Sequence, residues 1–450
     1  MKMREEEFSA AIDVPVSREE LFDWHAGDGA LERLLPPFQR VKIRRAAEAM
    51  KEGETVVLRL RTGPFFKDWV ARLEEVSPPA YFVDVQEKGP FGAWRHEHHM
   101  EALGETRSRL EDKVRWRLPM GLERIGPLRK RTEAELRRLF AFRHRRMNED
   151  LDRRRRWGTG EGKRVLISGA SGLIGARLAA YLRTLGFHVA GLTRGAVRDG
   201  WIHWDPAQGV LAPDDLEGWD ALIHLAGEPI ADGRWTTERK RRIRESRIAS
   251  TRLLVDRMRA AKRPPKVFLC ASGVNFYAAE TTFLQKVCLE WEAEAVRAEE
   301  AGIRTIRMRT GIVLDPAGGA LAKMLPAFRL GLGGPIGSGG QGFPFIGMDD
   351  LLDLYYRGIQ DEQMNGAIDA LSPGAGDQRS FSRVLGRVLR RPAFLPLPAT
   401  VVKILFGEMG KETLLADLPS GPENPPPSDH PFRHAGAEDC LRFLLGREIA

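Results

Sequence analysis

Apolar and polar residues alternate along much of the chain between residues 55 and 118, which predicts a run of β-strands. The alternation is found in five segments: TVVLRLRT, WVARLEEV, YFVDVQE, WRHEHHMEAL and SRLEDKVRWRL. Ahead of them, SREELFDWHA predicts a helix whose Ser17 and Glu20 stand at the spacing of a capping box. Behind them, apolar residues recur at helical spacing, namely Leu136, Phe140, Met147 and Leu151. This order predicts an α+β domain in which an antiparallel sheet grips one long helix.

A different rhythm begins at residue 163, where short apolar strands alternate with helical stretches. The strands are KRVLIS, HVAGLTR, DALIHLAG, KVFLCAS and RTIRMRTGIVL. Such alternation predicts an α/β domain with a Rossmann-type, doubly wound parallel sheet. We therefore expect an α+β helix-grip domain over 1–156, a Gly-rich linker over 157–162, a dinucleotide-binding domain over 163–360 and an α-rich substrate lobe over 361–450.

The segment GASGLIG follows the first of these strands and opens a helix, which is the context of a dinucleotide-binding turn. We expect Gly169 to allow the tight turn and Gly172 to let the backbone approach a pyrophosphate. Gly175 then lets the helix and the strand pack closely. The first amides of the helix supply hydrogen-bond donors and a positive dipole end for phosphate.

The end of the second strand, Leu192-Thr193-Arg194, indicates which dinucleotide is bound. NAD-binding proteins usually carry an acidic residue there, which bonds the ribose 2′-hydroxyl. This chain has a guanidinium instead, which suits a 2′-phosphate. The sequence therefore predicts NADP(H) as the cofactor, unless Arg194 only points outward.

Composition excludes several classes of protein. Apolar residues make up 42% and charged residues 29% of the 450, as in globular proteins. No run of about 18 apolar residues is present, so we expect no membrane span. The first 15 residues lack an apolar secretory core. The cysteines Cys270, Cys288 and Cys440 lack metal-site spacing, which suits a reducing cytoplasm.

Much of the net charge of +8 lies in residues 129–156. Such a basic segment is typical of an anion or nucleic-acid patch. It also fits the solvated face of the amphipathic helix, and the basic residues are not interleaved with aromatic ones as in a base-stacking surface. We therefore expect no nucleic-acid partner.

The segment HEHH places His96 and His98 on one face of a strand, where they could chelate a metal ion. No cysteine or acidic cluster nearby marks a third and a fourth ligand. We therefore expect histidines on the sheet surface or lining a pocket, and no metal site.

The second half of the chain resembles the extended short-chain dehydrogenase/reductase superfamily, and within it the epimerase-like proteins of uncertain substrate that are described as sugar-epimerase-like or cell-division-inhibitor-like. The resemblance is carried by VLISGASGLIG, ALIHLAGEPIADGRWTTERKRRIRESRIASTRLLV, FLQKVCLEWEAEA, RMRTGIVLDPAGGAL and GGPIGSGGQGFPFIGMDDLLDLYYRGI. It implies that six residues face the pyrophosphate: Gly169, Ser171, Gly172, Leu173, Ile174 and Gly175. It implies that Thr193 and Arg194 face the 2′-phosphate and that Asp205 approaches the adenine. It places six more beside the ribose and the nicotinamide, namely Leu225, Ala226, Gly227, Thr310, Gly311 and Val313.

Residues 8–152 resemble the START/polyketide-cyclase-like helix-grip superfamily. The similar segments are ALERLLPPF, WVARLEEV, FVDVQEKGPFGAWRHEH and RLFAFRHRRMNEDL. The resemblance implies a cavity between the sheet and the long helix that holds an apolar ligand.

The resemblance to dehydrogenases also raises a question about catalysis. Members of that superfamily use a Tyr whose pKa is lowered by a Lys four residues later. Here Phe283 and Val287 take those places, while Tyr277 and Lys286 stand nine residues apart. The remaining catalytic candidates are Ser272 and Tyr277, with Arg247 or Lys240 as the cation that Tyr277 would need. The substrate candidates are Glu228, Arg234, Trp235 and Arg247.

Three functions fit these features. The first is an NADP(H)-dependent oxidoreductase or nucleotide-sugar-epimerase-like enzyme that acts on a small molecule. The second is a catalytically impaired regulatory protein or sensor of NADP(H), which the missing Tyr/Lys pair favours. The third is a chain that delivers an apolar ligand from its first domain to the nucleotide domain.

Overall fold

The chain divides into two units in the computed structural model, which describes residues 5–62, 65–197 and 200–447. The first unit runs to Thr159 and also includes Arg183–Leu185 and the residues from Phe443 onward. The second unit consists of Gly160–Leu182 and Gly186–Arg442. Each unit has its own sheet, and the two are described separately.

The sheet of the first unit is antiparallel, in the strand order β1-β7-β6-β5-β4-β3-β2. Its strands are β1 (Glu6–Val14), β2 (Val41–Arg45), β3 (Thr55–Thr62), β4 (Phe65–Ser77), β5 (Tyr81–Lys88), β6 (Ala93–Gly104) and β7 (Arg107–Arg117). Side chains along β7 and the first part of β6 alternate between buried and more exposed positions. The alternation of the sequence thus becomes one covered and one open face.

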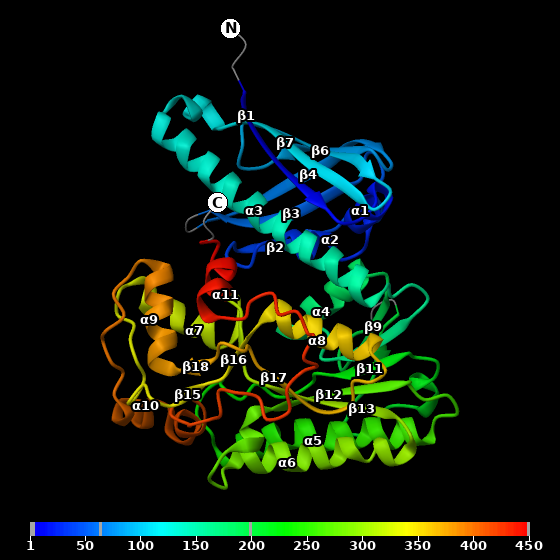
Figure 1. Cartoon of the computed structure of the whole chain (residues 1–450), viewed down its shortest axis with the longest axis vertical. Coiled ribbons are helices and arrows are strands. Elements are labelled where there is room, and N and C mark those ends of the chain that lie inside the picture. Colours follow the sequence, from blue (N-terminus) through cyan, green and yellow to red (C-terminus); the bar gives the residue numbers. More distant parts are fainter. Residues whose placement is uncertain (1–4, 63–64, 198–199, 448–450) are drawn as a thin grey trace. The chain divides into compact units, whose positions relative to one another are not determined.

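Helices cover that face (Figure 1). They are α1 (Arg18–Ala26), α2 (Ala30–Leu34), the 3₁₀-helix η1 (Pro119–Arg124) and the long α3 (Gly126–Trp157). The predicted capping box begins α1: Ser17 Oγ accepts from Glu20 N at 3.1 Å, and Glu20 accepts from Ser17 N at 3.3 Å. The four apolar positions expected on the inner side of the long helix are buried, namely Leu136, Phe140, Met147 and Leu151.

The basic face of α3 differs from the expectation of a solvated surface. Arg146 and Arg153 are buried, at 2% and 6% exposure. The Arg146 guanidinium lies 4.4 Å from the ring centre of Phe142 and donates to the carbonyl of Arg33. The expectation was wrong for these positions because a guanidinium can be buried when its N–H groups and its flat face both find partners.

The second unit has a parallel sheet in the order β10-β9-β8-β11-β12-β13-β17. Its strands are β8 (Arg164–Ser168), β9 (His188–Thr193), β10 (Ile202–His203), β11 (Ala221–His224), β12 (Val267–Gly273), β13 (Arg304–Thr310) and β17 (Gly366–Ala370). Two short ladders accompany it: β14 (Ile312–Leu314) with β16 (Phe345–Gly347), and β15 (Gly342–Phe343) with β18 (Gly376–Asp377). The strand order turns back between β8 and β11, where doubly wound sheets bind their ligands. The predicted α/β fold class is confirmed.

Helices lie on both faces of this sheet. In Figure 1, α5 (Thr237–Ala260) and α6 (Phe283–Val296) run along one face, and α4 (Leu173–Thr184) and α8 (Met348–Gln360) along the other. The remaining helices are α7 (Gly319–Arg329), α9 (Gln378–Leu389), α10 (Ala399–Thr413), α11 (Ala437–Leu444) and the 3₁₀-helices η2 (Pro213–Leu216), η3 (Val274–Tyr277) and η4 (Glu299–Ala301). Within the described ranges, no helix combines the length and the apolar character that a membrane crossing requires. The segment after residue 360, expected as a lobe of its own, contributes the edge strand β17 to the same sheet.

Candidate functional site

The glycine-rich turn between β8 and α4 is held by backbone packing. Gly169 has φ +72°, and a Cβ there would stand 2.9 Å from the amide nitrogen of Ala226. A Cβ on Gly175 would stand 2.2 Å from the carbonyl oxygen of Gly169. Both positions therefore require glycine, for the reasons that the sequence indicated. Between them, Ser171, Gly172 and Leu173 are exposed at the start of α4. The amide of Gly172 donates to the carbonyl of Gly169 at 2.9 Å and closes the turn. The amides of Ser171 and Leu173 remain as donors for an anion such as a pyrophosphate.

A buried polar group fixes the end of β11 against this turn. Ser168 Oγ lies 2.5 Å from His224 Nδ1, and His224 Nε2 lies 3.0 Å from Ser250 Oγ. The amides of Leu225 and Ala226 donate to Ser168 Oγ at 3.2 and 3.3 Å. Burial, helped by the charge of Arg247, lowers the pKa of His224 to about 3. The imidazole is therefore neutral and acts as a rigid spacer between β8, β11 and α5.

The three residues expected on the adenosine side lie at the adjoining strand ends. Thr193 is the last residue of β9, and the exposed Arg194 follows it. Asp205, after β10, accepts from the amide of Ala207 at 2.9 Å and from the side chain of Gln208 at 2.8 Å. The carboxylate of Asp205 thus stabilises its own turn, and its approach to an adenine stays a prediction.

The residues expected beside a nicotinamide follow β13. Thr310 ends that strand, and Val313 lies in β14 opposite Ile346. A Cβ on Gly311 would stand 2.8 Å from the carbonyl oxygen of Pro344, so this glycine is needed for packing. Residues 225–227 follow the carboxyl end of β11, and Thr310 and Gly311 stand at the carboxyl end of β13 in the same sheet, whereas Val313 belongs to the short ladder that follows β13.

The two catalytic candidates belong to one polar network at the same edge of the sheet. Ser272 on β12 lies in register with Arg309 on β13, which lies in register with Asp369 on β17. Ser272 Oγ donates to Glu292 of α6 at 2.7 Å, and Arg309 donates to both oxygens of Glu292 at 2.8 Å. Arg309 also reaches the hydroxyl of Tyr277 at 2.6 Å. The network therefore runs from Ser272 through Glu292 and Arg309 to Tyr277.

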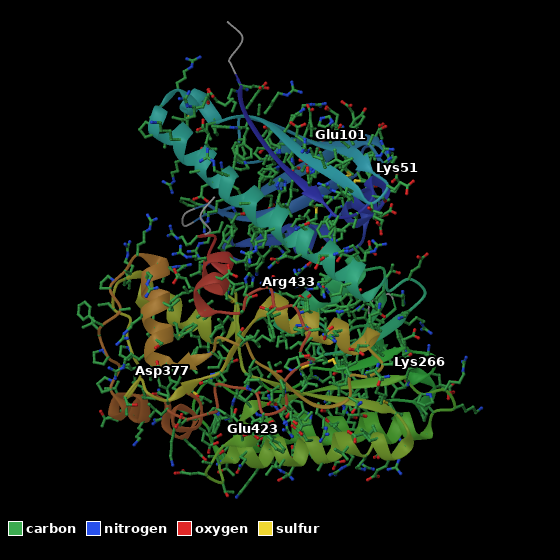
Figure 2. The ribbon with its side chains drawn as sticks, viewed as in Figure 1. Lys51, Glu101, Lys266, Asp377, Glu423 and Arg433 are labelled. Carbon is green, nitrogen blue, oxygen red and sulfur yellow. The ribbon has the colours of Figure 1, made fainter. Side chains whose placement is uncertain are left out.

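All hydrogen-bonding positions of the Tyr277 hydroxyl are taken within the protein. It accepts from Arg309 and from the side chain of Asn424 at 2.7 Å, and it donates to Asp369 at 2.9 Å. The amides of Glu423 (Figure 2) and Asn424 donate to the other oxygen of Asp369. A phenol has one proton and two lone pairs, so no position is left for a substrate without rearrangement.

The electrostatic surroundings of Tyr277 also make its hydroxyl unsuited to act as a catalytic base. Burial raises the pKa of Tyr277 above its usual value, and Asp369 adds to that rise against the opposing effect of Arg309. A catalytic base needs the opposite shift at neutral pH. The expected cation partner was also wrong: Arg309 contacts the phenol, whereas Lys240 pairs with Glu408 at 2.7 Å.

We predict that Tyr277→Phe lowers the free energy of unfolding by about 1–3 kcal/mol, because Arg309, Asn424 and Asp369 lose a half-buried partner that all three share. Urea denaturation of the wild type and the variant measures the difference. If the Tyr277 hydroxyl were catalytic and not structural, Tyr277→Phe would instead abolish turnover and leave the free energy of unfolding unchanged. Tyr81→Phe is a matched control, because that hydroxyl reaches Glu75 only at 3.4 Å.

The four substrate candidates fall into two neighbouring groups. Near the end of β11, Arg247 donates to the carbonyl of Glu228 at 3.0 Å, and the amide of Glu228 donates to Ser246. Arg234 donates to the carbonyl of Ile404 in α10 at 2.9 Å. The Trp235 ring meets the edge of Phe283 at 5.2 Å between ring centres. Their contact with a substrate stays a prediction.

Phe283, which stands in the place of the usual tyrosine, begins α6. Its amide and that of Leu284 donate to the buried carboxylate of Glu412 at 3.0 and 2.9 Å. Val287 is buried, whereas Lys286 is exposed. The helix start is therefore built around a carboxylate cap and an aromatic ring, with no proton-transferring pair on these positions.

The sequence reasoning missed Glu292, Arg309, Asp369 and Glu412. Arg309 and Asp369 carried a signal, since both stand near the ends of apolar strands whose carboxyl ends meet at one edge. Glu292 and Glu412 carried none, because a charged residue in an amphipathic helix is normally solvated.

The first unit holds a hollow of about 510 Å³ between α3 and the sheet. Its walls are largely apolar and aromatic, with arginines among the lining residues; they include Phe38, Arg61, Trp69, Phe91, Trp94, Leu136 and Arg138. His96 and His98 point to the covered face of β6 and are 3% and 7% exposed. Of the two interpretations, that of a free sheet surface was wrong, whereas His98 lines a small cavity between the sheet and α3, as the other interpretation expected.

Comparisons with known proteins agree with this geometry. The model of the NAD dependent epimerase/dehydratase family matches residues 165–368. An epimerase family protein of Mycobacterium bovis is 32% identical over 296 residues, which cover 63% of this chain and 98% of that protein. The crystal structure of a nucleoside-diphosphate sugar epimerase from Corynebacterium glutamicum is 30% identical, with a TM-score of 0.76 over 98% of this chain and 90% of that one.

A crystal structure of the human epimerase family protein SDR39U1 (isoform 2) with NADPH is 29% identical to this chain. Its TM-score is 0.56, and the match covers 63% of this chain and 99% of the human one. The sheet order, the glycine-rich turn and the near-complete coverage of the mycobacterial relative agree with one another. The chain therefore belongs to the NAD dependent epimerase/dehydratase family.

Proposed function

We propose that the second unit binds NADP(H) and uses it to oxidise, reduce or epimerise a nucleotide-sugar-like small molecule. The glycine-rich turn carries this proposal, because Gly169 and Gly175 hold the exposed residues Ser171 and Leu173 at the start of α4, where their amides can donate to a ligand. A pyrophosphate there would meet backbone donors and the positive end of the helix dipole. The human relative that was crystallised with NADPH supports the choice of a dinucleotide.

Arg194 decides between the two dinucleotides. It is exposed directly after the last residue of β9, where a ribose 2′-substituent lies in proteins of this fold. A guanidinium can bind a phosphate through two parallel N–H donors, whereas a free 2′-hydroxyl offers it little.

We predict that Arg194→Ala raises the Kd for NADPH by about 10- to 100-fold, since a charge-assisted hydrogen bond contributes about 1.5–3 kcal/mol, and leaves the Kd for NADH nearly unchanged. Fluorescence titration with each nucleotide gives both values. Arg263→Ala is the matched control, because that side chain is 77% exposed and precedes β12, at the opposite edge of the sheet. Equal losses for the two nucleotides would refute a 2′-phosphate contact.

The substrate class is proposed from the relatives and from the candidate residues. A nucleoside-diphosphate sugar carries phosphates and hydroxyls, which guanidinium and carboxylate groups recognise. Arg234, Arg247 and Glu228 supply such groups, and the Trp235 ring gives a flat surface for a base or a sugar. The similar protein from Corynebacterium glutamicum is a nucleoside-diphosphate sugar epimerase.

Catalysis requires a reversible hydride transfer and a proton-transferring group. The pair usual in dehydrogenases is replaced by Phe283 and Val287, and the hydroxyls of Ser272 and Tyr277 are bonded within the protein. Incubation of the chain with NADPH, a panel of carbonyl compounds and nucleotide sugars, followed at 340 nm and by product analysis, tests turnover. Binding of NADPH without turnover of any compound would favour a sensor over an enzyme.

For the first unit we propose an apolar ligand in the hollow between α3 and the sheet. The aromatic side chains of Trp69, Phe91 and Trp94 give it a surface that binds hydrocarbon, and its volume of about 510 Å³ is that of a small-molecule site. Arg61 and Arg138 among the lining residues suit a ligand with an anionic end. The resemblance of residues 8–152 to the START-like superfamily supports this proposal.

A further inference from the structure

Two histidines and two carboxylates come together on the covered face of the antiparallel sheet, outside the proposed dinucleotide site. His96 and His98 stand two residues apart on β6 and share a face. In the sheet register, Asp84 on β5 lies opposite His96, and Asp112 on β7 lies opposite His98. Three neighbouring strands therefore position four side chains that can bind metals or protons.

The distances among three of these side chains match those of a metal site. Asp84 Oδ2 lies 3.2 Å from His96 Nδ1 and 3.5 Å from His98 Nε2. One ligand atom from each of the three residues lies within 4.8 Å of the others. Bonds of 2.0–2.1 Å in tetrahedral coordination place two ligand atoms about 3.3 Å apart. Asp84 thus stands from each imidazole at the separation that a single ion spans, and the ligand atoms of His96 and His98 lie within 4.8 Å of each other.

Asp112 stands behind the two imidazoles. Its Oδ1 lies 2.9 Å from His96 Nε2, and it lies at the same distance from His98 Nδ1, although that second approach is too bent for a regular hydrogen bond. Its Oδ2 lies 2.6 Å from His144 Nε2 on α3. A histidine that binds a metal commonly donates its second N–H to a carboxylate, which fixes the ring. Here one carboxylate faces the second nitrogen of both rings.

We propose that Asp84, His96 and His98 bind one divalent transition-metal ion of the zinc type, with Asp112 as the carboxylate that orients both imidazoles. Two imidazole nitrogens and one carboxylate form a ligand set that suits such ions, whereas Mg²⁺ and Ca²⁺ are bound mainly by oxygen ligands. The side chains of His96 and His98 are 3% and 9% exposed, and that of Asp84 is 21% exposed. The ion is therefore reached from the side of Asp84, where a further ligand such as water completes the coordination.

Charge explains why an ion is suited to this place. Asp84 and Asp112 bring two negative charges to a largely buried face. The guanidinium of Arg143 is near enough to interact electrostatically with both carboxylates. A divalent cation with neutral imidazoles balances the two carboxylates. Protonated imidazoles of His96, His98 and His144 would also balance the charge of the two carboxylates, in an ion-pair network without metal. The two states differ in whether the chain takes up metal, which can be measured.

The test uses the full chain, stripped of metal by dialysis against a chelator and titrated with Co²⁺. We expect one Co²⁺ per chain with a visible d–d absorption, which Zn²⁺ abolishes by displacement and Mg²⁺ leaves unchanged. His98→Ala and Asp84→Asn should each weaken Co²⁺ binding at least 100-fold. Asp112→Asn should weaken it by about 10- to 100-fold, as for other carboxylates behind metal-binding histidines.

His99→Ala is the matched control, because His99 follows His98 on β6, is 40% exposed and pairs with Glu97. It should bind Co²⁺ as the wild type does. A wild-type chain that shows no Co²⁺ absorption overturns the proposal, and so does absorption that persists at wild-type affinity in Asp84→Asn. Circular dichroism of each variant checks its fold, and Asp84→Asn, which keeps the size of the side chain, decides the question if His98→Ala does not fold. The NADPH titration is independent of these results.

Discussion

Replacing Arg433 by methionine should lower the free energy of unfolding of the second unit by about 3–5 kcal/mol. The side chains of Arg433 (labelled in Figure 2) and of Asp353 on α8 are both 0% exposed. They form two hydrogen bonds of 2.7 Å. The hydroxyl of Tyr181 donates to the same carboxylate at 2.7 Å. Removal of the guanidinium leaves a buried carboxylate without its counter-charge, which is the most unfavourable outcome for such a pair.

Two further variants separate this effect from a general loss of packing. The double variant Arg433→Met with Asp353→Leu removes both charges and should recover most of the lost stability, because well-packed apolar residues can replace a buried pair. Lys266→Met breaks the exposed pair with Asp220, in which Lys266 is 80% exposed, and should change stability by less than about 1 kcal/mol. Chemical denaturation compares the four proteins. Equal losses for Arg433→Met and Lys266→Met would show that the buried pair contributes no more than a surface one.

The Gly175→Ala variant should lose NADPH binding by about 100-fold, because a displacement of about 1 Å in a binding turn has effects of that size. The added Cβ would stand 2.2 Å from the carbonyl oxygen of Gly169 and 2.8 Å from the Cα of Ala170. Both are backbone atoms, so the turn itself must move. The exposed amides that we propose for the pyrophosphate then lose their arrangement.

Gly376→Ala is the control for this substitution. A Cβ on Gly376 meets no atom within 4 Å, and its φ lies outside the left-handed region. This variant should bind NADPH as the wild type does. Isothermal titration of NADPH into the three proteins measures the effect, and thermal melting shows whether each is folded. A folded Gly175→Ala chain with wild-type affinity would contradict the assignment of the turn.

Local sequence determined the elements and the turn. Ser17 and Glu20 specify a helix start because both partners of the capping box lie within one turn. The apolar alternation of β6 and β7 specifies which face is covered, since side chains of a strand point to opposite sides in turn. Gly175 specifies the turn because the backbone of Gly169 and Ala170, close to it in sequence, excludes a side chain, and Gly169 because of its positive φ; the tertiary contact of Gly169 with Ala226 adds to this.

The polar networks of the two units could be predicted much less well. Tyr277 was expected to find a cation in Lys240 or Arg247, and it meets Arg309 instead, because β12 and β13 bring their ends together in parallel register. His96 and His98 were expected to lack acidic partners. Asp84 and Asp112 are supplied by the strands on either side, 12 residues before His96 and 14 after His98.

The sequence by itself therefore determined the strands, the helices, the glycine-rich turn and the parallel fold, since each depends on periodicity or on contacts within a few residues. Only the tertiary structure decided which charged groups meet. Arg433 finds Asp353, Arg309 finds Tyr277, and His96 lies between two carboxylates. These pairs join elements distant in sequence, and a charged residue carries no local sign of whether it will be buried with a partner or left in water.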